Sequence, residues 1–333
     1  MKFSVALCTY NGSQFLAEQL ASLVGQTRPP DELIICDDCS SDNTLDILRA
    51  FAATAPFKVH LKTNEQNLGS TKNFEQAINL CSGDLIALCD QDDVWLSQKL
   101  ARTESLFVSQ PEVGAVFTDA EMVDENLRPL GQSLWAAIGF DEKKQQKAKA
   151  GQALRLLIDG NFATGATVAF REEYRDLVLP IPQIEECIHD AWIVLLISAV
   201  ARLGFIDEPT MLYRRHPRQQ VGIDPEDYEP ASLKRDGTRI PDQLLLAIAR
   251  QTSFAMEIDK CRELRDRLMQ CGNRYDCTAA LAQVESKLNH FETRNNMPRE
   301  KLRRLPQVLR ELLSLRYHSY SRGFKSAAKD LFV

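Results

Sequence analysis

Residues 1–120 alternate between two hydrophobic patterns. Unbroken apolar runs at 5–8, 33–36 and 85–89, and a weaker one at 59–61, are typical of buried strands. Between these runs, apolar residues recur at helical spacing, as they do from Phe15 to Val24. Apolar strands that alternate with amphipathic helices predict an α/β domain, in which a mostly parallel sheet is flanked by helices.

The remainder of the chain changes character twice. We expect a strand at 167–170, a helix at 190–201 and strand-like segments at 205–206 and 211–213. Residues 221–241 hold three prolines and many charged side chains, which indicates a linker. The pattern is then helical only, with breaks near 272–273, 295–298 and 315–316. The sequence therefore predicts a first domain over 1–225, a linker over 226–241 and an all-helical C-terminal region over 242–333.

Polar residues gather where the predicted strands end. The four clusters are Thr9-Tyr10-Asn11, Asp37-Asp38, Asn64-Glu65-Gln66-Asn67 and Asp90-Gln91-Asp92-Asp93. The carboxyl ends of parallel strands meet at one edge of a sheet, and α/β folds bind their ligands there. We therefore expect the four clusters to form one binding site.

The acidic cluster is the most informative of the four. Asp90, Asp92 and Asp93 place three carboxylates within four residues, which is unfavourable unless a positive charge lies beside them. Mg²⁺ or Mn²⁺ prefers carboxylate oxygens and needs few protein ligands when a diphosphate supplies the others. The alternative is a solvated acidic turn in which Asp93 caps a helix. Asp38 is a second candidate, because Asp42 already suits the helix cap and leaves Asp38 to accept from a ribose or a base.

Charge and cysteine content limit the expected binding partners and the expected cellular compartment. The net charge of −6 hides a basic tail, because residues 299–333 hold nine Lys or Arg and three Asp or Glu. An acidic body argues against a general nucleic-acid binder. The tail suits contact with acidic lipid headgroups, a homodimer contact, or a packing helix with a solvated face. Nine scattered cysteines and no membrane-spanning apolar run favour a cytoplasmic protein, peripheral at the inner membrane face if the tail binds lipid.

Three motifs together resemble family 2 glycosyltransferases with a GT-A fold. They are Val5-Ala6-Leu7-Cys8-Thr9-Tyr10-Asn11-Gly12, Ile35-Cys36-Asp37-Asp38-Cys39-Ser40-Ser41-Asp42 and Gly83-Asp84-Leu85-Ile86-Ala87-Leu88-Cys89-Asp90-Gln91-Asp92-Asp93-Val94-Trp95. The last motif is most similar to the bacterial rhamnosyltransferases that build surface polysaccharides. The resemblance covers about residues 1–230 and implies that the nucleotide sugar is dTDP-rhamnose, with UDP-sugars as the alternative.

The resemblance also implies roles for residues at the sheet edge. Thr9, Tyr10 and Asn11 would line the nucleotide pocket, and Asp38 would hold the base or ribose. Asp90 would contact the ribose or the sugar. Asp92 would bind the metal, and Asp93 would hold a donor-sugar hydroxyl or a basic side chain.

The acceptor side rests on later segments of the chain. Asp190 opens a predicted helix, where a carboxylate is stabilised, and the resemblance makes it the base that deprotonates the acceptor hydroxyl. A simple helix cap is the alternative, and His189 is a rival base. Thr164, Gly165 and Trp192 would contact the donor or acceptor sugar, although strand entry and core packing explain them equally well.

The segment Tyr213-Arg214-Arg215-His216 resembles the family's Tyr-Arg-x-His motif. His216 would complete the metal shell, and Arg214 and Arg215 would neutralise the diphosphate. The expected reaction is a single displacement that inverts the sugar, with a glycan or lipid-linked glycan as acceptor. A sugar nucleotidyltransferase and a non-catalytic glycan-binding scaffold are the competing functions. The first lacks its Gly-rich basic loop, and the second would not retain every expected carboxylate.

Overall fold

The computed structural model describes residues 1–184, 187–219, 242–298 and 300–332. The chain divides into two compact units, the first built from residues 1–183 and 187–219 and the second from the described residues after 241. The linker predicted at 226–241 lies outside the described residues. None of the described helices is long and apolar enough to cross a membrane.

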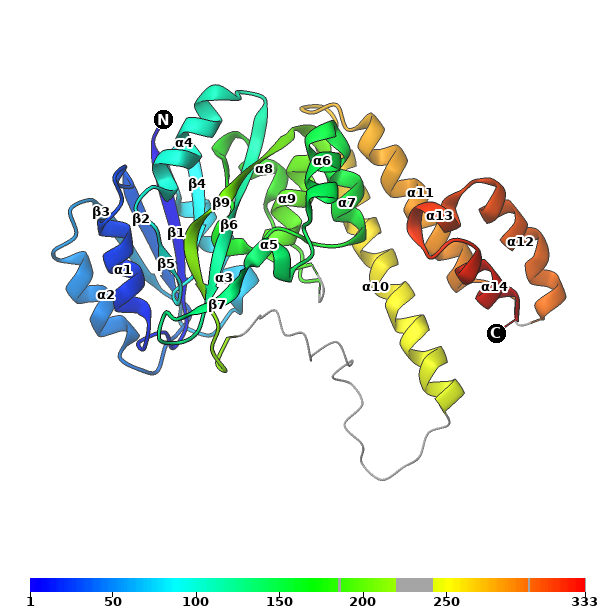
Figure 1. Cartoon of the computed structure of the whole chain (residues 1–333), viewed down its shortest axis with the longest axis horizontal. Coiled ribbons are helices and arrows are strands. Elements are labelled where there is room, and N and C mark those ends of the chain that lie inside the picture. The colour runs from blue at the N-terminus through cyan, green and yellow to red at the C-terminus, as the bar shows by residue number, and fades with distance from the viewer. Residues whose placement is uncertain (185–186, 220–241, 299, 333) are drawn as a thin grey trace. The chain divides into compact units, whose positions relative to one another are not determined.

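A nine-stranded sheet forms the centre of the first unit, in the order β3-β2-β1-β4-β8-β6-β9-β5 with β7 paired to β6 (Figure 1). The strands are β1 (Phe3–Thr9), β2 (Glu32–Asp37), β3 (Lys58–Thr63), β4 (Leu85–Cys89), β5 (Val94–Trp95), β6 (Val113–Val123), β7 (Pro129–Ser133), β8 (Ala169–Arg171) and β9 (Arg202–Arg214). β3, β2, β1 and β4 are parallel, as the sequence predicts. β8, β5 and β7 run antiparallel to their neighbours, so the complete sheet is mixed.

Helices cover both faces of the sheet. They are α1 (Leu16–Val24), α2 (Thr44–Ala52), α3 (Ser70–Leu80), α4 (Lys99–Ser109), α5 (Leu134–Ala137), α6 (Glu142–Lys147), α7 (Ala153–Asp159), α8 (Arg175–Val178) and α9 (His189–Val200). Phe3, Val5 and Leu7 of β1 point to one face, where they share a core with the leucines of α1. The whole of β1 is buried, which explains why its apolar run is continuous rather than alternating.

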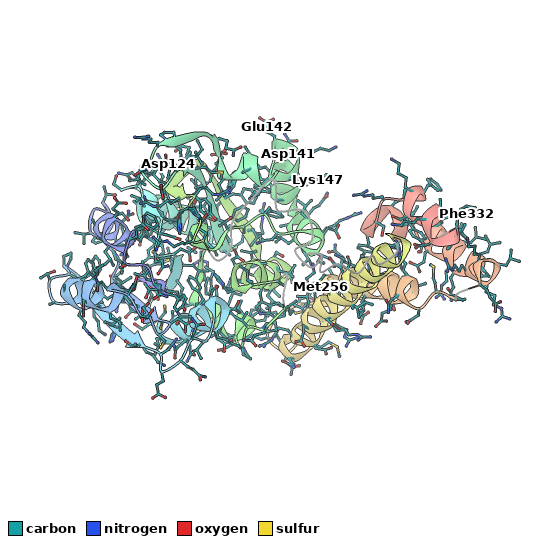
Figure 2. The ribbon with its side chains drawn as sticks, turned by 90° about the horizontal axis from the view of Figure 1, so that it is seen from below. Asp124, Asp141, Glu142, Lys147, Met256 and Phe332 are labelled. Atoms are coloured by element: carbon teal, nitrogen blue, oxygen red, sulfur yellow. The ribbon has the colours of Figure 1, made fainter. Side chains whose placement is uncertain are left out.

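The second half of the sheet differs from the sequence prediction. β6 is an eleven-residue strand that the sequence reading did not identify, and β9 joins the two predicted strand-like segments into one strand of thirteen residues. β6 and β9 pair in parallel with three register irregularities. The predicted strand at 167–170 begins as a 3-10 turn over Gly165–Thr167 before β8. Asp141, labelled in Figure 2, accepts from the Lys144 N–H at 2.9 Å and so caps α6.

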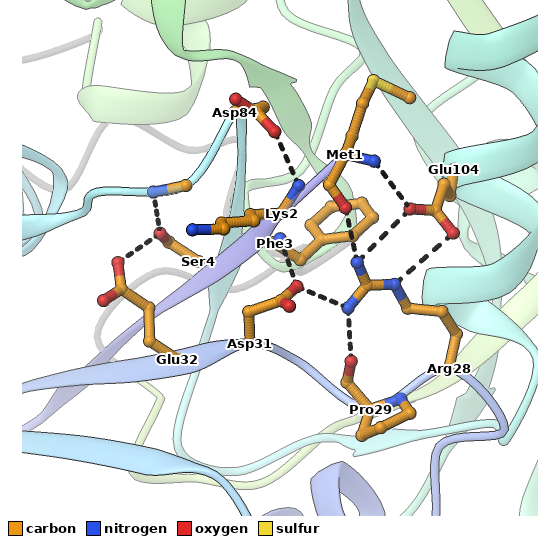
Figure 3. A network of polar contacts seen from close by, with 11 residues as sticks. Met1, Lys2, Phe3, Ser4, Arg28, Pro29, Asp31, Glu32, Asp84 and Glu104 are labelled. Atoms are coloured by element: carbon orange, nitrogen blue, oxygen red, sulfur yellow. Dashed lines mark hydrogen bonds and ion pairs between the residues drawn. The ribbon is translucent and has the colours of Figure 1, made fainter.

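Charged side chains tie the strands together at the amino end of the sheet (Figure 3). Glu32 is buried and accepts from the Ser4 hydroxyl at 2.5 Å and from the Ser82 N–H at 2.6 Å. Asp31 accepts from the Phe3 N–H and from Arg28. Burial raises the pKa values of Asp31 and Glu32, but these hydrogen bonds outweigh it and leave both pKa values below their ordinary range.

The second unit is helical throughout its described part. It contains α10 (Asp242–Cys271), α11 (Thr278–Asn295), α12 (Lys301–Leu313), α13 (Arg316–Tyr320) and α14 (Phe324–Phe332). The breaks fall where the sequence predicts them, with a further one at Gly323. A buried polar group holds α11 to α12: His290 Nδ1 and Glu311 Oε2 lie 2.7 Å apart. α14 is held similarly, because Asp330 accepts from Arg294 and Tyr317.

Candidate active site

The polar clusters after β1, β2 and β4 lie side by side at the carboxyl edge of the sheet. Parallel register pairs Thr9 with Asp37 and Leu7 with Cys89, so the residues that follow these strands are neighbours. Thr9 Oγ1 donates to Asp37 at 2.7 Å, and Asp37 also accepts from Ser40. β3 is also parallel to β2, and the Asn64 N–H donates to the Asp37 carbonyl, so the structure brings all four predicted clusters to one edge.

Gln91 connects the end of β4 to the end of β1. Its Oε1 accepts from the Tyr10 N–H at 2.8 Å, and its Nε2 donates to the Tyr10 carbonyl at 3.0 Å. A Cβ at Gly12 would lie 2.1 Å from Gln91 Oε1, so only glycine leaves room for this contact. The sequence reading assigned Gln91 no role, although its position between Asp90 and Asp92 was the available signal.

Asn11 and Tyr10 form the outer part of this edge. Asn11 has a φ of 49°, and its Oδ1 accepts from the Ser41 N–H at 2.8 Å, which links the first cluster to the turn after β2. Cys39 in that turn has a φ of 64° and is exposed. Tyr10 is 37% exposed. Its ring is therefore accessible for stacking on a planar ligand, as the nucleotide prediction requires.

Asp38 is buried, and its contacts are with the protein. Its Oδ1 accepts from Asn64 Nδ2 and from the Leu68 N–H, both at 2.8 Å, and its Oδ2 accepts from the Gly69 N–H at 2.9 Å. These bonds fix the loop after β3 against the end of β2. The structure therefore assigns Asp38 a positioning task that the sequence reading did not foresee. Any contact with a ribose or base would use the remaining lone pairs of the same carboxylate.

The acidic cluster concentrates negative charge in a partly buried place. Burial, followed by the charges of Asp92 and Asp190, raises the pKa of Asp90 to about 8. Asp190 is tied to the same region of the sheet, because its Oδ2 accepts from the Gly165 N–H and the turn after Gly165 is bonded to β4 through the Leu88 N–H and the Val168 carbonyl. Asp93 is buried, with its Oδ1 accepting from the Arg214 N–H at 3.0 Å and its Oδ2 unpartnered among the described residues. Burial and the two neighbouring carboxylates raise its pKa as well.

Lys99 is the buried cation that the sequence reading missed. It opens α4, its Nζ lies 4.9 Å from the centroid of the Trp95 ring, and burial lowers its pKa to about 8. The charge of Asp93 opposes that lowering, so Lys99 is the neighbouring cation that partly offsets Asp93. Lys99 is the first residue of α4 and lies just after the strand that ends at Trp95, and this closeness in the chain was the available signal.

His216 lies beside the metal ligand predicted in the acidic cluster. Its Nε2 is 2.9 Å from Asp92 Oδ2, and its Nδ1 accepts from the Arg218 N–H at 3.2 Å. Its ring packs on Phe15 at 4.7 Å between centroids. Within the described residues no three His, Cys, Asp or Glu side chains converge as a complete metal-binding group. Asp92 beside the His216 imidazole, and Asp93 with an unpartnered buried oxygen, are nevertheless a donor set that a divalent cation fits.

Asp190 lies at the start of α9 and is buried. Its Oδ2 accepts from the Gly165 N–H at 2.8 Å, and its Oδ1 accepts from the Ala191 N–H at 2.6 Å. Burial raises its pKa to about 6, against the opposite effect of these hydrogen bonds. A Cβ at Gly165 would lie 3.0 Å from His189 Nε2 and 3.6 Å from Asp190 Oδ2, so glycine permits the close approach. A carboxylate with this pKa is ionised at neutral pH and accepts a proton more readily than an ordinary aspartate.

His189 does not compete with Asp190 as a base. Its ring is buried and stacked on Phe74 at 4.0 Å between centroids, and burial lowers its pKa to about 3. Such an imidazole stays neutral and is too weak a base for the predicted proton transfer.

Two sequence predictions are corrected by burial. Arg214 is 1% exposed, and its guanidinium donates to the carbonyls of Asp92 and Glu125, each at 2.6 Å, and to Glu18. It holds the acidic cluster in place from its buried side and does not reach a diphosphate. Trp192 is fully buried, and its Nε1 donates to the Val178 carbonyl at 3.0 Å, so its ring is part of the core and does not stack on a sugar.

The remaining candidates, Thr164 and Arg215, are neither fully buried nor fully exposed. Thr164 is half-buried, and its carbonyl accepts from the Thr167 hydroxyl at 2.6 Å in the turn before β8. Arg215 is half-buried and follows β9, whose pairing to β6 is continued by the Arg215 N–H bond to the Val123 carbonyl. Of the two predicted phosphate-binding arginines, only Arg215 retains the exposure that this role requires.

The mixed sheet flanked by helices is a GT-A-type fold, and solved S. aureus TarS structures share this fold. The S. aureus TarS structure of residues 1–349 in complex with UDP-GlcNAc aligns with a TM-score of 0.53 and 16% identity, covering 99% of this chain and 91% of that chain. The family described as Glycosyl transferase family 2 matches residues 4–174, which is more than half of the chain. The chain belongs to this family.

Two curated relatives cover most of the chain. The "Uncharacterized glycosyltransferase alr2836" of Nostoc sp. is 25% identical over 272 residues, covering 80% of this chain and 81% of that protein. The dTDP-rhamnosyl transferase RfbG of Shigella flexneri is 26% identical over 230 residues, covering 65% of this chain and 73% of RfbG. The chain is therefore a glycosyltransferase, as the motifs at the sheet edge indicated.

Proposed function

We propose that this enzyme transfers a sugar, with inversion, from a nucleotide donor to a hydroxyl group of a glycan or lipid-linked glycan. The observation that carries the proposal is the position of Asp190, whose Oδ2 accepts from the Gly165 N–H in the turn bonded to β4, where burial raises its pKa to about 6. Asp190 takes the proton of the acceptor hydroxyl, whose oxygen forms a bond to the anomeric carbon. The bond from that carbon to the diphosphate breaks, and its electron pair leaves with the nucleoside diphosphate.

The residues at the sheet edge hold the donor in this proposal. Tyr10 offers an exposed ring for the base, and the turn of Asn11 and the loop held by Asp38 bound the nucleotide. Asp92 and His216 would hold Mg²⁺ or Mn²⁺, and Asp90 would face the donor sugar. Asp93 is buried and would instead hold a basic side chain, Lys99, behind the site. When bound, the cation stabilises the negative charge that develops on the leaving diphosphate.

dTDP-rhamnose is the donor that we propose. The support is the amino-acid sequence of the motif from Asp90 to Trp95, together with the similarity to RfbG, which is named as a dTDP-rhamnosyl transferase. A UDP-sugar is the alternative donor, since the solved TarS complex contains UDP-GlcNAc. A thermal-shift screen of dTDP- and UDP-sugars, with and without Mn²⁺, separates the two, because a ligand that binds only the folded state raises its melting temperature.

Asp190→Asn tests the reaction itself. The amide keeps the shape of the carboxylate but cannot take a proton, so we expect transfer to fall by about 10²–10⁴-fold while the donor-induced thermal shift is retained. Asp92→Ala is the companion variant and should lose the metal-dependent part of that shift. Near-normal transfer by folded Asp190→Asn would show that another group is the base. An unchanged metal-dependent shift in Asp92→Ala would remove Asp92 from the proposed ligands.

A further inference from the structure

Apolar side chains are exposed along one side of α12 and on α14. Fifteen large apolar side chains are exposed among the described residues, and seven of them lie between Leu302 and Phe332. We call these seven the C-terminal apolar set: Leu302, Leu305, Leu309, Leu313, Leu315, Phe324 and Phe332. Leu302 is 89% exposed and Leu313 is 85% exposed. A group of such exposed apolar side chains marks an interaction surface, whereas single scattered ones do not.

The spacing in α12 places its four leucines on one face. Positions 302, 305, 309 and 313 recur at intervals of three and four residues, so the side chains form a stripe along the helix. Val308 and Glu311, on the opposite side, are buried against the rest of the second unit. The packing requirement of α12 is thus met by its other face, and the leucine stripe is not part of the core.

Leu315 adds a second unusual feature next to the stripe. It has a φ of 58°, a left-handed conformation that a leucine rarely adopts, and it is 62% exposed. Glycine or asparagine would hold this turn at lower cost. Neither backbone conformation nor core packing accounts for a leucine there, whereas a contact with an apolar phase does.

Among residues 299–333, which carry the C-terminal apolar set, the exposed charges are nearly all positive. Residues 299–333 contain three acidic side chains, but Glu311 and Asp330 are buried and bonded to His290, Arg316, Arg294 and Tyr317. Glu300, which is exposed, pairs with Arg303. The exposed cations are Lys301, Arg303, Arg310, Arg322, Lys325 and Lys329. The folded structure therefore removes most of the negative charge from this surface and leaves the positive charge outside.

The two helices are joined at one end of this surface. Lys301 Nζ donates to the Phe332 carbonyl at 2.6 Å, and Arg304 donates to the Asp330 carbonyl at 2.8 Å. The beginning of α12 and the end of α14 therefore lie together, which brings Leu302 into the neighbourhood of Phe332, labelled in Figure 2.

We propose that the C-terminal apolar set is a membrane-docking surface that binds the headgroup region of an anionic lipid bilayer. Exposed leucines and phenylalanines flanked by lysine and arginine are the combination that partitions into such an interface. A second copy of this chain fits less well, because two such surfaces would bring their positive charges together. The proposal concerns the second unit and does not rest on the donor or the chemistry of the first.

Co-sedimentation of the full chain with vesicles tests the docking surface. We expect binding to vesicles of phosphatidylcholine mixed with phosphatidylglycerol, and much weaker binding to phosphatidylcholine alone. The paired variant Leu302→Ser/Leu313→Ser should weaken binding by roughly tenfold or more. Lys325→Glu/Lys329→Glu should weaken it by about tenfold or more and reduce its salt dependence.

A matched control separates this surface from general apolar exposure. Val108→Ser/Met269→Ser removes two side chains that are 65% and 61% exposed but lie on α4 and α10, and it should bind vesicles as the unchanged protein does. All variants should keep the melting temperature and the donor-induced thermal shift, because the altered side chains are exposed. The proposal is overturned if the unchanged protein does not bind anionic vesicles, or if the leucine variant binds them as well as the unchanged protein does. It is equally overturned if light scattering shows a dimer that the leucine variant dissociates, which would assign the surface to a second copy.

Discussion

Replacing Arg214 tests whether this arginine supports the site from within or binds the donor. The side chain is 1% exposed and donates to the carbonyls of Asp92 and Glu125. A hydrogen bond from a charged donor contributes about 1.5–3 kcal/mol, so loss of both bonds in Arg214→Met should cost about 3–6 kcal/mol. The Glu18 ion pair adds little, because the Glu18 side chain is 53% exposed and screened by water.

The unfolding of the first unit can be followed separately. The three tryptophans, Trp95, Trp135 and Trp192, all lie in it, so tryptophan fluorescence in urea reports this unit alone. Arg214→Met should lower the urea midpoint strongly. Arg214→Lys should lower it by less, because an ammonium keeps a charged donor for one of the two carbonyls, although it cannot reproduce the fork of the guanidinium. Arg218→Ala is the matched control, because Arg218 is exposed on the same segment, and its midpoint should not change.

The opposite pattern would refute this reasoning. If Arg214→Lys kept the urea midpoint of the unchanged protein but lost donor affinity, the guanidinium would be a ligand of the diphosphate, as the sequence alone suggested. Arg215→Ala provides the comparison, because we expect that half-buried side chain to affect donor affinity more than the midpoint.

Three further outcomes follow from the geometry. Log kcat/KM should fall with a slope of one as the pH drops through about 6, because Asp190 accepts a proton only when ionised; a flat pH profile would exclude it as the base. Gly165→Ala should lower kcat at nearly unchanged stability, because the added Cβ meets His189 and Asp190; normal kcat would show that the loop yields freely. Glu32 has a lowered pKa in the folded state, so its stabilisation is complete above its ordinary pKa of 4.5 and is lost as the pH falls through the lowered value. The urea midpoint should therefore drop in acid, and by less in Glu32→Gln; equal drops would place the acid sensitivity elsewhere.

Much of the first unit could be predicted because the strands that are buried on both faces have continuous apolar sequences. The runs that became β1, β2 and β4 are apolar throughout since both faces of these strands are covered, and their parallel order brings the following polar residues to one edge. β6 was missed because its residues mix apolar side chains with Thr118, Asp119 and Glu121, so its run is interrupted even though most of it is buried.

Side-chain direction was the part that sequence could not supply. Arg214 and Trp192 stand within motifs that suggested ligand contacts, yet both point into the protein, because the packing of β9 and α9 decides which way each residue faces. Gln91 and Lys99 were overlooked for the same reason. Gln91 contacts Tyr10, which is distant in the chain, and Lys99 lies over Trp95 because of the turn between β5 and α4.

The turn that holds Cys39 gives the protein a chemical handle. All nine cysteines are thiols outside any disulfide, seven are buried, and Cys271 is only partly accessible, so Cys39 is the thiol most open to reagents. It follows Asp38 directly, at the edge where we propose that the nucleotide binds. A maleimide fluorophore should therefore label the native protein selectively at Cys39 and report donor occupancy without any engineered residue. By the same logic, thiol-alkylating agents should inhibit this enzyme, and bound donor should protect it.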